Sequence, residues 1–228
     1  MLRPFTLHRP RTADEACELL GRLGDDAAPY AGGTELLLLM KEGLLRPRHL
    51  VDVKRIPGLA AIAGDGARVV IGATATHRTV ERSALVKARC PVVAAVARHV
   101  ANVRVRNVGT VGGNLAFADP HSDLATLFLA LDASVELVSP RGRRALPMAE
   151  FVRGPWETAR EPDELLASVT LAPGPGRAAA AYVKFGVYER PTLGIALVLL
   201  LEDGGNGGAR GAGRARVAGA RIAIGCVN

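Results

Sequence analysis

Aromatic residues and lysines are scarce in this chain. Aromatic side chains make up 4% of the 228 residues, so the core must consist mainly of Ala, Val and Leu. Lysine occurs at four positions only, and nearly all of the positive charge behind the net +7 is arginine. The arginines are scattered and are not interleaved with aromatic residues, as a base-stacking platform would require. Nucleic acid is therefore not an expected partner, whereas an acidic surface or an anionic ligand is.

Cysteine and histidine form no recognisable ligand pattern. Cys17, Cys90 and Cys226 are few, odd in number and far apart, which excludes a disulfide framework and an iron–sulfur motif. The histidines, His77 and His121 among them, lack the spacing of a metal site, although these two follow glycine-containing motifs and a cofactor contact stays open for both. No Ser-His-Asp set or carboxylate pair stands out, so the chain is predicted to have no catalytic residue and no metal ligand of its own.

Long apolar runs are also missing. The longest covers residues 193–201, far short of the ~20 residues that a membrane-spanning helix needs. The start, Met1-Leu2-Arg3-Pro4, lacks the apolar core of a signal peptide. A cytoplasmic protein without a membrane span is expected.

Two glycine motifs are the most informative feature that is present. The first reads Ala31-Gly32-Gly33-Thr34-Glu35-Leu36, and the second reads Gly109-Thr110-Val111-Gly112-Gly113-Asn114. Paired glycines can expose backbone N–H groups to an anion without interference from a Cβ atom. Neither motif matches a Walker A loop or Gly-x-Gly-x-x-Gly. Two such loops, each followed by a helical segment, predict a diphosphate held from two sides.

The surrounding pattern predicts an α+β chain in three parts: residues 1–55, 56–172 and 177–228. The first alternates strands and helices, with a capping box at Thr12 and Glu15. The second combines helices at 76–83, 91–99 and 123–131 with mostly antiparallel strands, among them 68–72, 134–138 and 165–171. The third has strand-like runs at 182–187, 195–202 and 216–224. Linkers are expected at 173–176 and in the glycine-rich stretch 204–213.

Asp123 lies directly before an apolar helix, so two roles stay open for it. It can cap that helix, or its carboxylate can accept hydrogen bonds from a ribose diol.

Together with Ile71-Gly72-Ala73-Thr74-Ala75-Thr76, these two motifs resemble the FAD-binding medium subunit of the molybdenum hydroxylases. This family includes xanthine dehydrogenase, aerobic carbon monoxide dehydrogenase and 4-hydroxybenzoyl-CoA reductase. The resemblance covers nearly the whole chain and implies a PCMH-type FAD-binding fold of two α/β subdomains. A C-terminal domain with a three-stranded antiparallel sheet follows them.

The resemblance also implies the residues that bind FAD. Residues 31–35 and 110–114 would wrap the diphosphate, Asp123 would hold the adenine-side ribose, and Lys184 would lie near the flavin. Leu166 would pack on the cofactor, and Val100 lies where relatives place an apolar or aromatic side chain. The full set of implied cofactor-binding residues is Ala31, Gly32, Gly33, Thr34, Glu35, Leu36, Thr74, Val100, Gly109, Thr110, Val111, Gly112, Gly113, Asn114, Asp123, Leu166 and Lys184.

The chain departs from the family pattern after residue 225, where relatives continue with further helices. The third part is therefore expected to be truncated, with an exposed apolar face on its sheet. A partner chain, a split gene or a truncation would each explain this.

The resemblance implies an electron-transfer subunit in a complex with two partners. A large subunit would carry molybdopterin, a small subunit would carry [2Fe-2S] clusters, and a terminal acceptor would reoxidise the FAD. Two alternatives stay open: a stand-alone flavin oxidoreductase, and a degenerate or assembly subunit that no longer binds FAD. The substrate and the acceptor are not encoded in these motifs.

Overall fold

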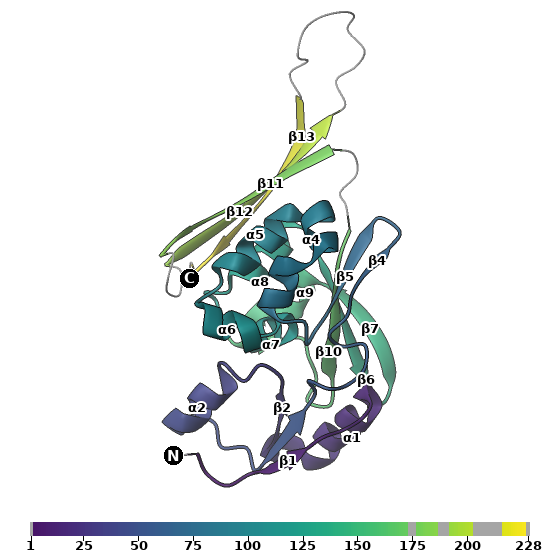
Figure 1. The fold of residues 1–228 in the computed structure, drawn as a ribbon, viewed down its shortest axis with the longest axis vertical. Helices are drawn as coiled ribbons and strands as arrows, with labels where there is room; N and C mark the ends of the chain where they lie inside the picture. Colours follow the sequence, from purple (N-terminus) through teal and green to yellow (C-terminus); the bar gives the residue numbers. More distant parts are fainter. Residues whose placement is uncertain (1, 173–176, 187–191, 203–215, 227–228) are drawn as a thin grey trace, which may run out of the picture.

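The three largest of the four described β-sheets follow one another along the chain and are stacked along the long axis of the molecule (Figure 1). A computed structural model describes residues 2–172, 177–186, 192–202 and 216–226. The predicted linkers at 173–176 and 204–213 lie outside the described residues. The three sheets fall within the three predicted parts of the chain, while the division into domains stays a prediction.

The first unit is a parallel α/β layer. Its elements are β1 (Thr6–His8), α1 (Ala13–Leu23), the 3-10 turn η1 (Gly24–Asp26), β2 (Ala27–Tyr30), α2 (Leu36–Glu42) and β3 (His49–Asp52). The strand order is β1-β3-β2, and all pairs are parallel. Thr12 caps α1 through Glu15 N at 3.1 Å, as predicted. The Glu15 carboxylate accepts from Arg11 N at 2.7 Å, one residue earlier than the usual capping box.

The second unit is built on an antiparallel sheet of order β4-β5-β10-β6-β7. Its strands are β4 (Ile62–Asp65), β5 (Arg68–Gly72), β6 (Ser134–Ser139), β7 (Gly142–Pro147) and β10 (Leu165–Leu171). Between β5 and β6 run the helices α3 (His77–Arg82), α4 (Ala84–Arg89), α5 (Pro91–His99), α6 (Val103–Val108), α7 (Val111–Phe117) and α8 (Asp123–Ala130). After β7 come α9 (Met148–Phe151), β8 (Val152–Gly154) and β9 (Glu157–Thr158). Phe128 and Phe151 are the largest fully buried side chains between the helices and the sheet.

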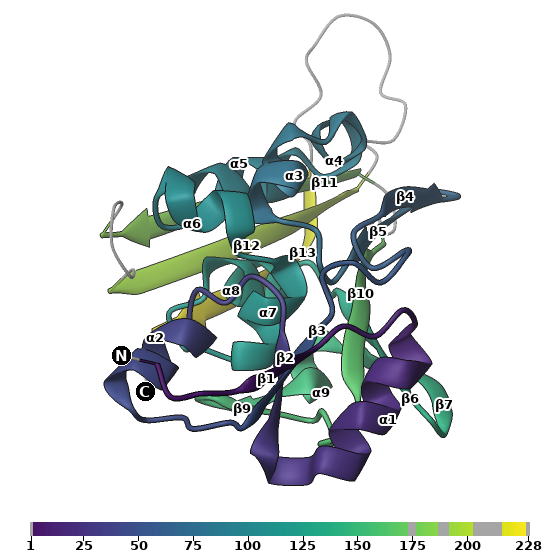
Figure 2. The same cartoon turned by 60° about the horizontal axis from the view of Figure 1, so that its bottom comes forward.

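The third unit is the predicted antiparallel sheet, made of β11 (Arg177–Phe185), β12 (Leu193–Glu202) and β13 (Arg216–Gly225). One face packs on α5 and α8, and both views place β12 beside α8 (Figures 1 and 2). The outer face carries Val183, Phe185, Ile222 and Ile224, which are 69%, 73%, 64% and 51% exposed. The expected exposed apolar face is therefore present.

The sequence analysis missed several short helices. It did not predict α4, α6 or α7, because each has only six or seven residues and shows little helical periodicity. Side-chain caps define their starts: Ser83 for α4, Asn102 for α6 and Thr110 for α7. None of the described helices is both long enough and apolar enough to cross a membrane.

An ion pair between the exposed Arg144 and the buried Glu164 ties β7 to the turn before β10. Arg144 donates from Nε and Nη2 to the two carboxylate oxygens of Glu164, both at 2.7 Å. Burial alone would raise the pKa of Glu164, but the hydrogen bonds from Arg144 hold that pKa below its usual value. The Glu164 carboxylate is only 4% exposed, so it depends on this partner.

We expect Arg144→Met to lower the free energy of unfolding by about 3 kcal/mol, because it leaves a buried carboxylate without its cation. The neighbouring Arg143→Met is the matched control. Arg143 pairs with Glu136 at 3.1 Å on the surface, and its loss should cost under about 1 kcal/mol. Urea denaturation measures both values. Equal losses of unfolding free energy in the two variants would show that the Arg144–Glu164 pair stabilises the fold no more than the surface pair does.

Candidate functional site

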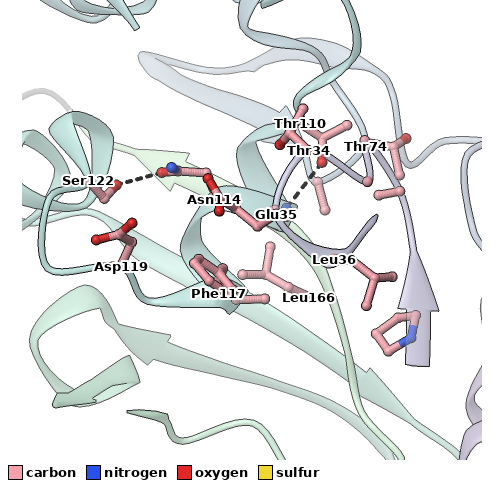
Figure 3. Close-up of a pocket in the computed structure, with 18 of the residues that line it drawn as sticks. Thr34, Glu35, Leu36, Thr74, Thr110, Asn114, Phe117, Asp119, Ser122 and Leu166 are labelled. Carbon is pink, nitrogen blue, oxygen red and sulfur yellow. Dashed lines mark hydrogen bonds between the residues drawn. The ribbon is translucent and has the colours of Figure 1, made fainter. Parts of the chain in front are cut away.

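A cavity of about 420 Å³ lies between the first unit and the helices of the second. Such a volume lies within the range of cofactor and small-molecule sites. Figure 3 shows side chains from α2, α7 and the start of β10 converging on it. Of the predicted cofactor-binding residues, the following line it: Ala31, Gly32, Gly33, Thr34, Glu35, Leu36, Thr74, Val100, Thr110, Gly112, Gly113, Asn114, Asp123 and Leu166.

The two glycine motifs touch each other at the cavity wall. A Cβ atom added to Gly32 would lie 2.8 Å from Gly109 Cα and would also collide with the carbonyl oxygen of Val108. Real Cβ atoms do not approach backbone so closely, so only glycine permits this contact. Segments about eighty residues apart therefore form one continuous wall.

The first motif presents unused backbone donors. Gly33 has φ +71°, which turns the chain sharply after β2. Among the described residues, no hydrogen bond from the amides of Gly32, Gly33 or Thr34 is found. Helix α2 begins directly afterwards, at Leu36. This segment has the unpaired N–H groups predicted for anion binding.

The second motif differs from the prediction, since it is the first turn of α7 rather than an open loop. Thr110 is the N-cap, and its hydroxyl accepts from Gly113 N at 3.1 Å. The amides of Val111 and Gly112 donate to the carbonyls of Ala75 and Ala73 at 3.0 and 2.7 Å, and Asn114 N donates to the Thr110 carbonyl. The amides of residues 111–114 are thus already paired, so the prediction of free donors from the second glycine pair is wrong.

Gly109 and Val111 do not line the cavity either. Val111 is fully buried in the core. The carbonyl of Gly109 accepts from His77 N at 3.0 Å, and its Cα supports Gly32 from behind. Both residues shape the wall without facing its interior.

Polar side chains from α7 and the turn before α8 form another part of the wall. Ser122 donates to Asn114 Oδ1 at 2.6 Å (Figure 3). His121 Nδ1 lies 2.9 Å from Asp119 Oδ1, and the same oxygen accepts from His121 N. Ser122 also caps α8 through Ala125 N at 3.0 Å. The helix-capping role considered for Asp123 therefore belongs to Ser122.

Asp123 joins the cavity to the third sheet. Its Oδ1 accepts from the Tyr182 hydroxyl at 2.7 Å, and its Oδ2 accepts from Lys184 Nζ at 2.9 Å. Lys184 does not line the cavity among the described residues, and it also donates to the His99 carbonyl at 2.8 Å. Asp123 and Lys184 are thus directly paired, and the separate roles predicted for them beside the ribose and the flavin stay predictions.

Two buried polar atoms in this wall have no partner. Thr74 Oγ1 and His77 Nδ1 are both buried and make no hydrogen bond within the described structure. Burial, together with the nearby Arg106 charge, lowers the pKa of His77 to about 4, so this imidazole is neutral at pH 7. Unpaired buried polar groups beside a cavity favour a bound molecule with hydrogen-bonding groups of its own.

The sequence analysis did not select several other lining residues, notably Phe117 and Arg160. Arg160 Nη1 donates to the carbonyls of Glu161, Pro162 and Glu164. It is the only Lys or Arg among the described lining residues. Burial lowers the pKa of Arg160, although nearby acidic groups oppose that shift. No local motif marks it, because the turn before β10 brings it to the cavity.

Comparison with known proteins identifies this architecture. Residues 3–173 match the model of the family described as "FAD binding domain in molybdopterin dehydrogenase". The chain belongs to this family. Within the described residues, no group of three His, Cys, Asp or Glu side chains could hold a metal ion.

Relatives in this FAD-binding family are subunits of oxidoreductases. The chain is 36% identical over 202 residues to the carbon monoxide dehydrogenase medium chain of Afipia carboxidovorans, covering 88% of this chain and 70% of the relative. It is 40% identical over 167 residues to the corresponding chain of Hydrogenophaga pseudoflava, covering 73% of this chain and 58% of that one. Other relatives carry the names xanthine dehydrogenase FAD-binding subunit and nicotine 6-hydroxylase medium subunit.

The solved structures agree with the sequence comparison. A chain of carbon monoxide dehydrogenase from Hydrogenophaga pseudoflava superposes with a TM-score of 0.90 at 35% identity. The match covers 99% of this chain and 75% of that chain. The predicted fold class, with an FAD-binding α+β architecture, is confirmed.

Stability should fall in mild acid because of His77. Its folded-state pKa of about 4 lies below the unfolded value near 6.5, so below pH 6.5 the unfolded chain binds the extra proton. The penalty is absent above pH 7, grows as the pH falls from 6.5 to 4, and approaches roughly 3 kcal/mol. In the His77→Leu variant this part of the pH dependence should disappear from urea denaturation curves. His99→Gln, at an exposed histidine, should keep the wild-type slope.

Proposed function

We propose that this chain is the FAD-binding electron-transfer subunit of a molybdenum-containing hydroxylase or dehydrogenase. The observation that carries the proposal is the wall formed by Gly32 and Gly109, which unites both FAD-family motifs around one cavity. Bound FAD supplies the redox chemistry of such a subunit, taking up electrons and releasing them to an acceptor. The protein binds and orients the cofactor and limits its access to water.

The cavity offers the groups that FAD requires. The amides of Gly32, Gly33 and Thr34 are suited to donate to the diphosphate, beside the start of α2. Asp123 keeps lone pairs that can accept from hydroxyl groups of the cofactor. Val100, Leu36 and Leu166 supply apolar contacts for a ring system.

The second glycine motif has a different role in this proposal. Its paired amides hold α7 against Ala73 and Ala75, and so fix the wall that supports Gly32. Thr110 and Asn114 contribute side chains to the cavity. Thr74 and Glu35 complete the proposed binding set, while Gly109, Val111 and Lys184 act from behind the wall.

The partners belong to the proposal as well. A large molybdopterin subunit and a small [2Fe-2S] subunit would deliver electrons, and a terminal acceptor would remove them. Because the relatives differ in the substrates that their names print, the substrate would be set by the large subunit. The cytoplasm is the proposed location, and residues 1–55, 56–172 and 177–228 are the proposed domains.

The visible absorption spectrum of the purified chain, with the released cofactor identified by mass, tests the FAD assignment. Flavin bands with released FAD support it. A folded, colourless protein that takes up no added FAD would contradict it and favour a degenerate subunit. Native mass addresses the partners: a monomer that holds flavin and turns over a substrate alone would favour the stand-alone oxidoreductase.

Gly32→Ala should weaken FAD binding by about tenfold to a hundredfold, because the new methyl group pushes the first motif away from Gly109. Gly154→Ala is the matched control. There the added Cβ meets only Glu157 Oε2, at 3.8 Å, so affinity should stay at the wild-type level. Quenching of FAD fluorescence measures both constants. Unchanged affinity in Gly32→Ala would place FAD elsewhere.

A further inference from the structure

The Asp123 carboxylate is held by two side chains from one strand of the third sheet. Tyr182 and Lys184 are two residues apart on β11, so both point to the same face of that sheet. They bind different oxygens of Asp123, at 2.7 and 2.9 Å. The carboxylate is 5% exposed and the Lys184 side chain 7%, so the pair lies inside the protein.

The backbone around this pair is shaped to allow it. Gly194 on β12 lies opposite Lys184 in the strand register. A Cβ atom on Gly194 would collide with the Tyr182 hydroxyl and would lie 3.2 Å from its Cζ atom. A side chain at this position would therefore displace the phenol from Asp123. The contact is built into the sheet as well as into the two side chains.

Both partners of Asp123 are hydrogen-bond donors, which suits a carboxylate acceptor. Burial and the adjacent carboxylate raise the pKa of Tyr182, so its hydroxyl remains a donor. Lys184 divides its donors between Asp123 and the His99 carbonyl at the end of α5. Each Asp123 oxygen accepts one of these two hydrogen bonds and keeps a further lone pair for a group in the cavity.

We propose that Tyr182 and Lys184 are positioning residues that aim Asp123 into the cavity and couple the third sheet to cofactor binding without touching the cofactor. This inference rests on the proposed function, because it takes FAD as the occupant. Binding is reciprocal: if the seated sheet strengthens FAD binding, FAD strengthens the seating of the sheet by the same factor.

A double-mutant cycle on FAD affinity tests the proposal. Lys184→Met alone should weaken FAD binding by about tenfold, a factor typical of one charge-assisted interaction. In an Asp123→Asn background the same substitution should change affinity by less than about twofold, because its route through the carboxylate is gone. Lys87→Met, at an exposed lysine on α4, is the control and should have no effect. Lys184→Arg should recover part of the lost affinity.

Tyr182→Phe is a milder second variant, which is less prone to misfolding because it removes one oxygen atom and keeps the ring. It should weaken FAD binding several-fold with Asp123 present and have little effect in the Asp123→Asn background. In hydrogen exchange, FAD should slow exchange in β11–β13 of the wild type and much less in Lys184→Met. Thermal unfolding without FAD checks that each variant is folded.

The outcomes separate the two proposals. A loss of affinity in Lys184→Met that is equally large in the Asp123→Asn background would show direct contact with FAD and overturn the positioning role. Unchanged affinity in both Lys184→Met and Tyr182→Phe would overturn the coupling while leaving the FAD site intact. Failure of the folded wild type to bind FAD would overturn the proposed function, and this inference with it.

Discussion

The close approach of Gly32 to Gly109 is the constraint on which the site depends. It brings a turn of the first unit against the end of α6, with no side chain between them. The first motif reaches this contact because it directly follows β2. The second motif is held in place by the hydrogen bonds of the α7 amides. The cavity is consequently a seam between two units of the fold.

The two sides of this seam divide their tasks. Free amides belong mainly to the first motif, because the amides of residues 111–114 in the second motif donate to Ala73, Ala75 and Thr110. An anion would therefore meet backbone donors mainly on one side, while the opposite side offers the side chains of Asn114, Ser122 and Asp123. This asymmetry gives the site a direction. A long ligand whose charged part must face the first motif can bind in a single orientation.

Much of the fold could be predicted from sequence because its longer elements have clear periodicity and caps. The strand at Leu165–Leu171 and the helix at Pro91–His99 were predicted to the residue. The glycine motifs also led to most of the cavity lining. What sequence could not provide was the pairing of atoms: whether the Gly112 amide is free, or whether Lys184 faces a ligand or Asp123, depends on contacts between distant segments. Arg160 was missed for the same reason, since only the turn before β10 carries it to the cavity.

The outer face of the third sheet bears on how this protein behaves in solution. Val183, Phe185, Ile222 and Ile224 form an apolar surface on strands with pronounced β propensity. Exposure of such a surface to water is unfavourable, and two copies of the chain can bury it against each other. This association becomes more important as the protein concentration rises. We therefore expect this face to favour self-association of the isolated chain, whereas repulsion from the net charge of +7 opposes it at low ionic strength.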